Sequence, residues 1–292
     1  MVSNITIGAA RPAPSFTPVF VAIDRQLLAA EGLNATIKYR ANAKDLLTGE
    51  VDFLASGHGH VEFVKGSDIR MVCGHSTRGG AHVLVVRPEI GDIKNLKHVL
   101  VAAEQNVFEL RNILAHYGID LDTSGIKLTM VDGSHPKQFE ALQRGEGDGA
   151  TLGAPWWMYA VKEGYKNMGS GDDFGHGLPG SGIYVAAQKL RENPDQVSRF
   201  VKAYVKTIKY CKENVSETLQ TITKYSADWG VNNLEVAKMA YDSAAPYWNP
   251  AVDPAAIDRL LRVTSEKLGK PTVPAEKFLE LRFLQSALRE AA

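Results

Sequence analysis

The segment "FLASGHGHVEF", from Phe53 to Phe63, places His58 and His60 two positions apart among glycines. An imidazole can bind a metal, transfer a proton near neutral pH, or hydrogen-bond a ligand. Structural zinc needs four ligands and catalytic zinc usually three, and neither a cysteine nor a spaced second histidine pair adjoins this segment. Metal binding is therefore the least favoured role, and we expect no metal site. The open alternatives are a ligand-contacting or proton-transferring role, or a purely local role at the start of a helix.

Two arginines follow expected strands and could recognise an acidic group. Arg78 lies in "HSTRGG" and Arg11 in "ARPAPSF". A guanidinium fork matches the oxygens of a carboxylate, sulfonate or phosphate. The alternative for each arginine is a solvated turn residue, and both are candidates for binding an acidic ligand.

Glu104 in "AAEQN" and the pair Trp156–Trp157 in "GAPWW" are further candidates. A carboxylate at Glu104 would repel an anion, but it could accept a donor of the ligand or exchange a proton opposite His58 or His60. It could also be a helix-start charge that the helix dipole favours. The tryptophans could offer an apolar face to a ligand, although one of the two is expected in the core.

Composition excludes several classes of function. The chain has 292 residues, 33 Lys+Arg against 33 Asp+Glu, and two cysteines. Zero net charge gives no reason to expect nucleic acid or an anionic membrane surface as partner. No apolar run approaches the ~20 residues of a membrane helix, so no membrane insertion is expected. Nucleotide-binding glycine motifs are absent from the sequence, and no cofactor is expected.

The N-terminus leaves localisation open. "MVSNITIGAA" lacks the basic region and apolar core of a signal peptide. A cytoplasmic protein is expected if Met1 is the native start, and a periplasmic or cell-surface protein if a signal segment has been removed.

Apolar periodicity predicts alternating strands and helices up to about residue 190, and then an almost wholly helical region. This order favours mainly parallel sheets covered by helices. Strands are predicted at 4–9, 34–40, 51–56, 69–75, 81–88, 98–103, 126–131, 148–153 and 181–190. Helices are predicted at 17–33, 43–50, 60–66, 105–118, 136–146, 154–164 and 193–214.

Four segments carry a resemblance to a known superfamily: "TPVFVAIDRQLLAAEGLNATIKY", "LLTGEVDFLASG", "GAPWWMYAVKEGY" and "NPDQVSRFVKAYVKTIKYCKEN". With the order of the elements, they resemble the type 2 periplasmic-binding-protein superfamily. The branch is that of the nitrate-, taurine- and alkanesulfonate-binding proteins and the thiamine-pyrimidine synthase-like proteins. The resemblance covers nearly the whole chain and implies a two-lobed α/β fold with an interlobe cleft and a helical C-terminal region.

The resemblance also implies where the lobes and the ligand lie. Lobe 1 is expected to comprise 1–87 and 184–292, and lobe 2 to comprise 88–183. The ligand is expected in the interlobe cleft, outside the carboxyl ends of the strands, which agrees with the rule for open α/β sheets. The candidate ligand-binding residues on the loops there are Arg11, Ser15, Asn42, His58, His60, Arg78, Glu104, Asn106, His135, Trp156, Trp157 and Ser181.

Two functions fit this sequence. The first is the solute-binding component of an ABC importer, which would bind a small acidic or aromatic molecule and have a permease as partner. The second is a cytoplasmic decarboxylase, lyase or hydrolase acting on a small organic acid, with His58, His60 and Glu104 as acid–base groups. The chain lacks the cysteine-rich motif of the thiamine-pyrimidine synthases, so that synthase activity is not expected.

Overall fold

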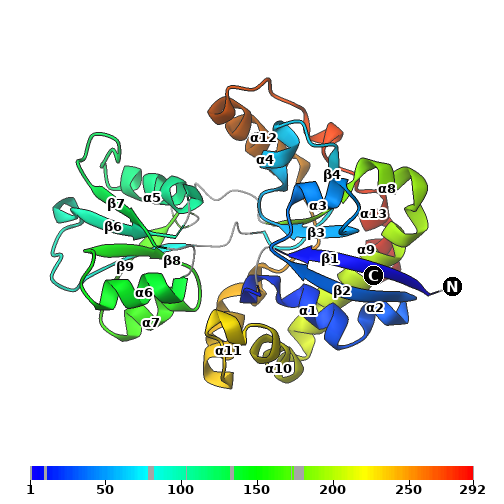
Figure 1. Cartoon of the computed structure of the whole chain (residues 1–292), viewed down its shortest axis with the longest axis horizontal. Coiled ribbons are helices and arrows are strands. Elements are labelled where there is room, and N and C mark those ends of the chain that lie inside the picture. The colour runs from blue at the N-terminus through cyan, green and yellow to red at the C-terminus, as the bar shows by residue number, and fades with distance from the viewer. Residues whose placement is uncertain are drawn as a thin grey trace. The chain divides into compact units, whose positions relative to one another are not determined.

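The computed structural model describes residues 2–9, 12–77, 82–102, 104–131, 135–171, 173 and 181–291, except for the side chains of Glu104 and Gln105. The chain divides into two compact units (Figure 1). Unit 1 comprises Met1–Gly79 and Leu178–Ala292, and unit 2 comprises Gly80–Gly177.

A five-stranded sheet forms the centre of unit 1. Strand β1 pairs in parallel with β2 and β3, whereas β10 runs antiparallel between β3 and β4. The carboxyl ends of four strands and the start of β10 therefore share one edge. In spatial order the strands are β2 (Leu33–Tyr39), β1 (Ser3–Ala9), β3 (Phe53–Ser56), β10 (Gly182–Ala186) and β4 (Ile69–Gly74).

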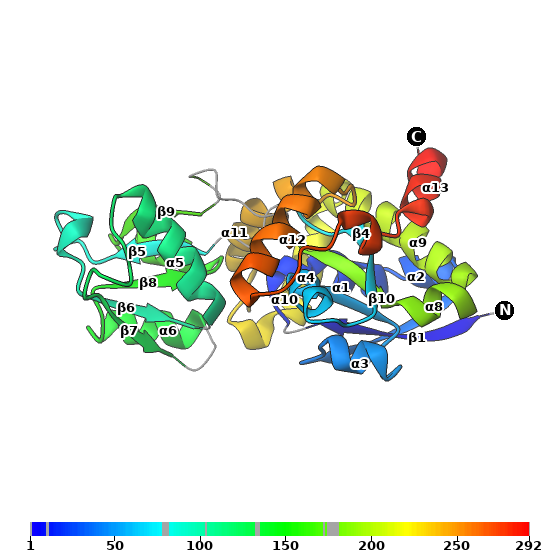
Figure 2. The same ribbon diagram turned by 90° about the horizontal axis from the view of Figure 1, so that it is seen from above.

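Neighbouring residues of a strand point to opposite faces of the sheet. Apolar residues therefore face both sides of this sheet, and helices cover both faces. Phe53 stacks on Phe200 of α9 with ring centroids 3.8 Å apart, whereas Leu54 packs in a separate cluster on the other face. That cluster includes residues of α3 (Ala43–Leu47), α4 (Gly59–Val64) and α12 (Pro254–Leu268). Helix α9 (Pro194–Glu213) contacts α1 (Thr17–Asp24), α2 (Leu27–Ala30), α8 (Ala187–Glu192), α10 (Val215–Tyr225) and α13 (Arg282–Ala291). Figure 2 shows α13 beside α9.

The remaining helical segments of unit 1 are short or lie after α10. They are α11 (Leu234–Ala244) and the 3-10 turns Pro14–Phe16, Ala227–Trp229, Ala245–Tyr247 and Ala275–Lys277.

Unit 2 repeats the strand order of unit 1. Its antiparallel strand β5 again occupies the fourth place, between β8 and β9, while β6 pairs in parallel with β7 and β8. In spatial order the strands are β7 (Lys127–Met130), β6 (His98–Val101), β8 (Gly149–Leu152), β5 (Val83–Val86) and β9 (Lys166–Ser170).

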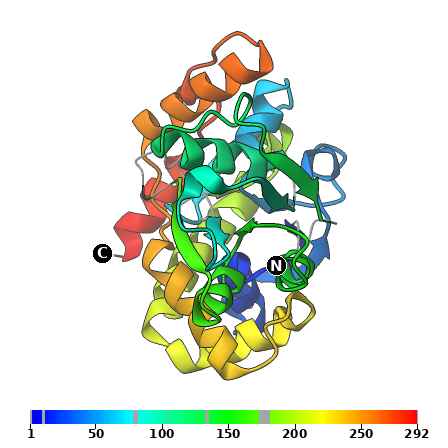
Figure 3. The same cartoon turned by 90° about the vertical axis from the view of Figure 1, so that its left-hand side faces the viewer.

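Helices also cover both faces of the second sheet (Figure 3). Residues of α5 (Glu104–His116) pack with Val99 and Val101 on one face. Residues of α6 (His135–Gln143) and α7 (Trp156–Lys162) pack with Leu100 on the other. A 3-10 turn, Ile93–Asn95, lies between β5 and β6. Two mainly parallel sheets with helices on both faces confirm the predicted α/β class.

Several predicted boundaries were wrong. The helix predicted at 17–33 is interrupted, because Gln26 adopts a left-handed conformation with φ 55° between α1 and α2. The strand predicted at 181–190 ends at Ala186, where the helix-forming run "AQKLRE" begins α8. Strand β9 was not predicted, since "KNMGS" has little strand propensity.

The lobe limits predicted after residue 87 and before residue 184 differ from the sheets at two strands. Strand β10 begins at Gly182 and pairs with β3 and β4 in the sheet of unit 1. A limit after residue 87 assigns the strand Val83–Val86 to the first lobe, but this strand pairs with β8 and β9 in the sheet of unit 2. The run "VLVV" is buried on both faces, so its composition alone does not say which sheet it joins.

Candidate functional site

The loops at one edge of the unit 1 sheet bring several predicted residues together. Ser15 follows β1, Asn42 follows β2, His58 follows β3, and Ser181 precedes the antiparallel β10. Because these strand ends share an edge, the loops form one polar rim there, which we call the unit 1 rim (residues 12–16, 40–42, 57–60, 75–77 and 181).

Asn42 begins α3 through a capping box. Its Oδ1 accepts from the backbone N–H of Lys44 at 2.8 Å, and the Asp45 carboxylate accepts from the backbone N–H of Asn42 at 2.8 Å. These bonds satisfy N–H groups that the helix start would otherwise leave unpaired. The observed role of Asn42 is to shape the loop; ligand contact stays a prediction.

The two histidines of the opening motif differ in their surroundings. His58 is exposed and occupies the position before α4, but its side chain makes no capping hydrogen bond. His60 is partly buried in the first turn of α4. Burial, together with the charges of His58 and Lys267, lowers the pKa of His60 to about 3. His60 is therefore neutral at pH 7 and is poorly matched to proton transfer there.

Gly59, between these histidines, is required by close packing. A Cβ atom at this position would lie 2.4 Å from two ring carbons of Tyr184, a buried residue of β10. Any larger residue would have to displace that ring. The glycine therefore lets α4 begin against β10.

His75 is a residue of the unit 1 rim that the sequence did not single out as a candidate. It is fully buried after β4, and its two ring nitrogens contact the backbone oxygen of Ser15 and the hydroxyl of Tyr204. Its backbone N–H donates to the Ser181 carbonyl at 2.9 Å. His75 thereby joins the loops after β1 and β4, the start of β10, and α9.

The hydrogen bonds of His75 define its protonation. A carbonyl only accepts, so Nε2 carries the proton toward Ser15, and Nδ1 then accepts from the hydroxyl of Tyr204. Burial lowers the pKa of His75 to about 4, although the bond to Ser15 acts to raise it. His75 is a neutral, fixed imidazole that positions the rim.

The corresponding edge of unit 2 holds Asn106 and His135. Asn106 is 2% exposed, and its Oδ1 accepts from the backbone N–H of Ala102 at 3.2 Å, which shapes the loop after β6. His135 begins α6 and contacts Gln138 through Nδ1 and His82 through Nε2, at 3.1 Å each. His82 directly precedes the antiparallel β5, so it lies at the same edge.

His82 also forms an ion pair with Glu109 of α5. Nδ1 of His82 lies 2.5 Å from Oε2 of Glu109, and both side chains are mostly buried. Burial alone would lower the pKa of His82, but the nearby carboxylate raises it above its usual value. The sequence gives no local sign of this cluster, because Glu109 and His135 come from segments distant from His82.

Trp156 and Trp157 both lie partly buried against the core of unit 2. Trp156 packs at tilted angles on Phe139 and Tyr159, with ring centroids 6.2 and 5.6 Å apart. Its indole Nε1 is buried and has no hydrogen-bond partner among the described residues. A ligand-stacking role for either tryptophan stays a prediction.

Three predicted residues cannot be placed. Arg11 and Arg78 lie outside the described residues, as does the side chain of Glu104. Their expected contacts with an acidic ligand, and the expected place of Glu104 opposite the histidines, stay predictions.

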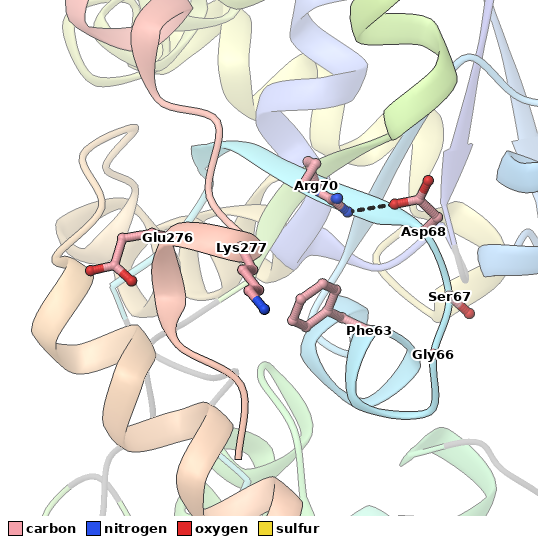
Figure 4. Close-up of a pocket in the computed structure, with 7 residues that line it drawn as sticks. All are labelled: Phe63, Gly66, Ser67, Asp68, Arg70, Glu276 and Lys277. Carbon is pink, nitrogen blue, oxygen red and sulfur yellow. Dashed lines mark ion pairs between the residues drawn. The ribbon is translucent and has the colours of Figure 1, made fainter. Parts of the chain in front are cut away.

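A hollow of about 500 Å³ lies at the opposite edge of the unit 1 sheet, where β4 begins (Figure 4). Arg70 on its wall forms an ion pair with Asp68 at 2.8 Å and lies 5.8 Å from the ring centroid of Phe63. Because its arginine is already paired and the hollow is remote from the strand carboxyl ends, we do not assign it the ligand.

No helix in the described ranges is long and apolar enough to cross a membrane. Among the same residues, no three His, Cys, Asp or Glu side chains gather where they could hold a metal ion.

Residues 13–218, more than half of the chain, match the family described as NMT1/THI5 like. The chain belongs to the NMT1/THI5-like family. No curated protein matches it. Among solved structures, this NMT1/THI5-like chain is similar to the periplasmic aliphatic sulphonate-binding protein SsuA of Escherichia coli. The TM-score is 0.75 at 15% identity, over 95% of this chain and 97% of that one.

Two further structures resemble this NMT1/THI5-like protein. The periplasmic nitrate-binding protein NrtA of Synechocystis PCC 6803 has a TM-score of 0.71 at 13% identity, over 99% of this chain and 89% of that one. A mutant of the desulfurization enzyme DszB, in complex with biphenyl-2-sulfinic acid, has a TM-score of 0.73 at 15% identity, over 99% of this chain and 100% of that one. These likenesses confirm the predicted two-lobed periplasmic-binding-protein fold. The family match confirms the NMT1/THI5-like branch.

Proposed function

We propose that this protein is the solute-binding component of an ABC importer and that it binds a small acidic molecule. The observation that carries the proposal is the likeness over 95% of the chain to a sulphonate-binding protein, together with membership of the NMT1/THI5-like family. A permease is the partner that this role implies.

Polar groups at the carboxyl edges of both sheets support an acidic ligand. The unit 1 rim presents the exposed His58 and Ser15, and its loops are held by the fixed His75. Backbone N–H groups at helix starts, such as that of α4 after His58, favour anions without needing a formal charge. Arg11 and Arg78 follow β1 and β4 in the sequence and are the proposed cationic contacts.

A thermal-shift screen over small carboxylates, sulfonates and pyrimidines tests the proposal, because a ligand that binds the native state raises its apparent stability. Calorimetry on each hit should give a single site. Arg78→Ala and His58→Ala should weaken that site, whereas Lys212→Ala at the end of α9 should not. If none of these compounds raises the melting temperature, the result counts against the proposal.

An enzyme acting on a small organic acid is the second candidate, since DszB is an enzyme with a similar fold. It needs an acid–base group in the unit 1 rim, and the neutral His60 fits that need poorly at pH 7. Turnover of a bound acid, lost in both His58→Ala and Glu104→Ala, would establish the enzyme in place of the binding protein.

A further inference from the structure

Two histidines of unit 2 point their Nε2 atoms at one another. The Nε2 atoms of His82 and His135 are 3.1 Å apart, although 53 positions separate the residues in the sequence. Both side chains lie at the carboxyl edge of the unit 2 sheet, one before β5 and the other at the start of α6.

The opposite nitrogen of each ring is held by an acceptor. Nδ1 of His82 lies 2.5 Å from a carboxylate oxygen of Glu109, and Nδ1 of His135 lies 3.1 Å from Oε1 of Gln138. The amide of Gln138 is oriented by donating to the Leu100 carbonyl at 2.6 Å. The amide oxygen of Gln138 accepts from Nδ1 of His135, and the ion pair with Glu109 favours a proton on Nδ1 of His82.

With both Nδ1 atoms protonated, each neutral imidazole turns the lone pair of Nε2 toward the other ring. Two lone pairs 3.1 Å apart repel each other unless a cation lies between them. That cation is either a proton or a metal ion. Metal-binding histidines in proteins usually donate the other ring N–H to a carboxylate, a carbonyl oxygen or water, which is the arrangement that Glu109 and Gln138 supply.

The separations of the rings and of their nitrogens also fit a shared metal ion. The ring centroids are 4.9 Å apart and the nitrogens 3.1 Å, so the centroid separation exceeds the nitrogen separation by 1.8 Å. A head-on N–H···N bond would make this excess about 2.3 Å, because each ring nitrogen lies about 1.15 Å from its centroid. If both rings tilt equally toward one point, that point lies about 2.0 Å from each Nε2 atom. The angle between the two Nε2 atoms at that point is about 100°, so the distance and the angle are both close to zinc–imidazole geometry.

We propose that His82 and His135 bind one divalent transition-metal ion, such as Zn²⁺ or Ni²⁺, through their Nε2 atoms. Glu109 and Gln138 orient the two imidazoles and do not bind the metal. No third His, Cys, Asp or Glu side chain of the described ranges joins them in a metal-binding group. Two imidazole ligands hold an ion more weakly than the four ligands of a structural zinc site.

Gly153 leaves room beside this pair. A Cβ atom there would lie 2.9 Å from Cδ2 and from Nε2 of His135, and 3.6 Å from Cδ2 of His82. A side chain at this position would press on the metal-binding nitrogen. The sequence "LGAPWW" therefore supplies a backbone that can approach the site closely.

Calorimetric titration at pH 7.5 tests the proposal. The full chain is first freed of metal with EDTA and is then titrated with zinc chloride or with nickel chloride. One ion should bind per chain, and His82→Ala and His135→Ala should each weaken binding at least tenfold. Glu109→Gln keeps both ligands and should weaken binding about ten- to a hundredfold through lost orientation. Thermal unfolding in EDTA, together with the far-UV circular dichroism of each variant, establishes that the variants are folded.

His58→Ala and His60→Ala are the matched controls, since they remove the other closely spaced histidine pair. They should bind both metals as the wild type does. The proposal is overturned if the wild type binds neither ion, which would leave a proton as the shared cation. It is also overturned if binding is lost in the His58 and His60 variants and kept in the His82 and His135 variants. No organic ligand enters this experiment, so its outcome is independent of the proposed solute-binding function.

Discussion

The buried imidazole of His75 accepts a hydrogen bond from the hydroxyl of Tyr204, which lies 129 positions away in the sequence. This bond joins the loop after β4 to α9, and the other ring nitrogen of His75 holds the Ser15 carbonyl after β1. Two sides of the unit 1 rim thus depend on one neutral side chain.

Acid should destabilise the protein through His75. Burial lowers the pKa of His75 in the native state to about 4, while an unfolded histidine titrates near 6.5. Between these pH values the unfolded state binds more protons, so the free energy of unfolding should fall as the pH falls from about 6.5 to 4. His75 should contribute a loss of about 3 kcal/mol across this window. Urea unfolding at several pH values measures it, and His75→Gln should show a shallower slope; an equal slope in both proteins contradicts the prediction.

Tyr204→Phe should destabilise unit 1 while keeping its aromatic packing. The ring of Tyr204 stacks with Phe200 at a centroid distance of 5.7 Å, and a phenylalanine preserves that contact. Removal of the hydroxyl leaves Nδ1 of His75 as a buried acceptor without its donor, which costs about 1–3 kcal/mol. Urea unfolding at pH 7 measures the loss. Tyr210→Phe on the same helix is the control and should change the stability by less than about 0.5 kcal/mol.

Gly59→Ala should cost about 1–3 kcal/mol of stability through overpacking. The added methyl group would lie 2.4 Å from the ring of Tyr184, and that ring is buried between β10 and α4. Gly57→Ala, two positions earlier, is a matched control because a Cβ there meets nothing within 4 Å. Chemical unfolding of both variants compares them directly, and equal losses would show that backbone freedom, not the clash, decides the effect.

The sequence predicts the alternating elements of this fold because apolar periodicity and cap residues are local signals. Asn42 before α3 and Pro194 at the start of α9 are such signals, and both helices begin within a residue of their predicted positions. The break at Gln26 and the weak strand β9 are not locally encoded, since contacts with other elements decide them.

The polar clusters are harder to predict than the elements. His82, Glu109 and His135 lie together only because β5 runs antiparallel among parallel strands. This direction places the residue before β5 beside the middle of α5 and the start of α6. A run of four apolar residues does not reveal that direction. His75 was likewise missed as a candidate because its partners, Ser15 and Tyr204, lie 60 and 129 positions away in the sequence.

Arg78→Ala should weaken the binding of an acidic solute. This prediction rests on the proposed solute-binding function. A guanidinium that forms two hydrogen bonds to a carboxylate or sulfonate contributes about 1.5–3 kcal/mol per charged bond, so Kd should rise at least tenfold. Arg78→Lys keeps the charge but loses the fork and should bind with intermediate affinity. Calorimetry with the best ligand of the screen measures all three proteins, and Arg289→Ala at the end of α13 should bind as the wild type does. Wild-type affinity in Arg78→Ala would remove Arg78 from the site and leave Arg11 as the cationic candidate.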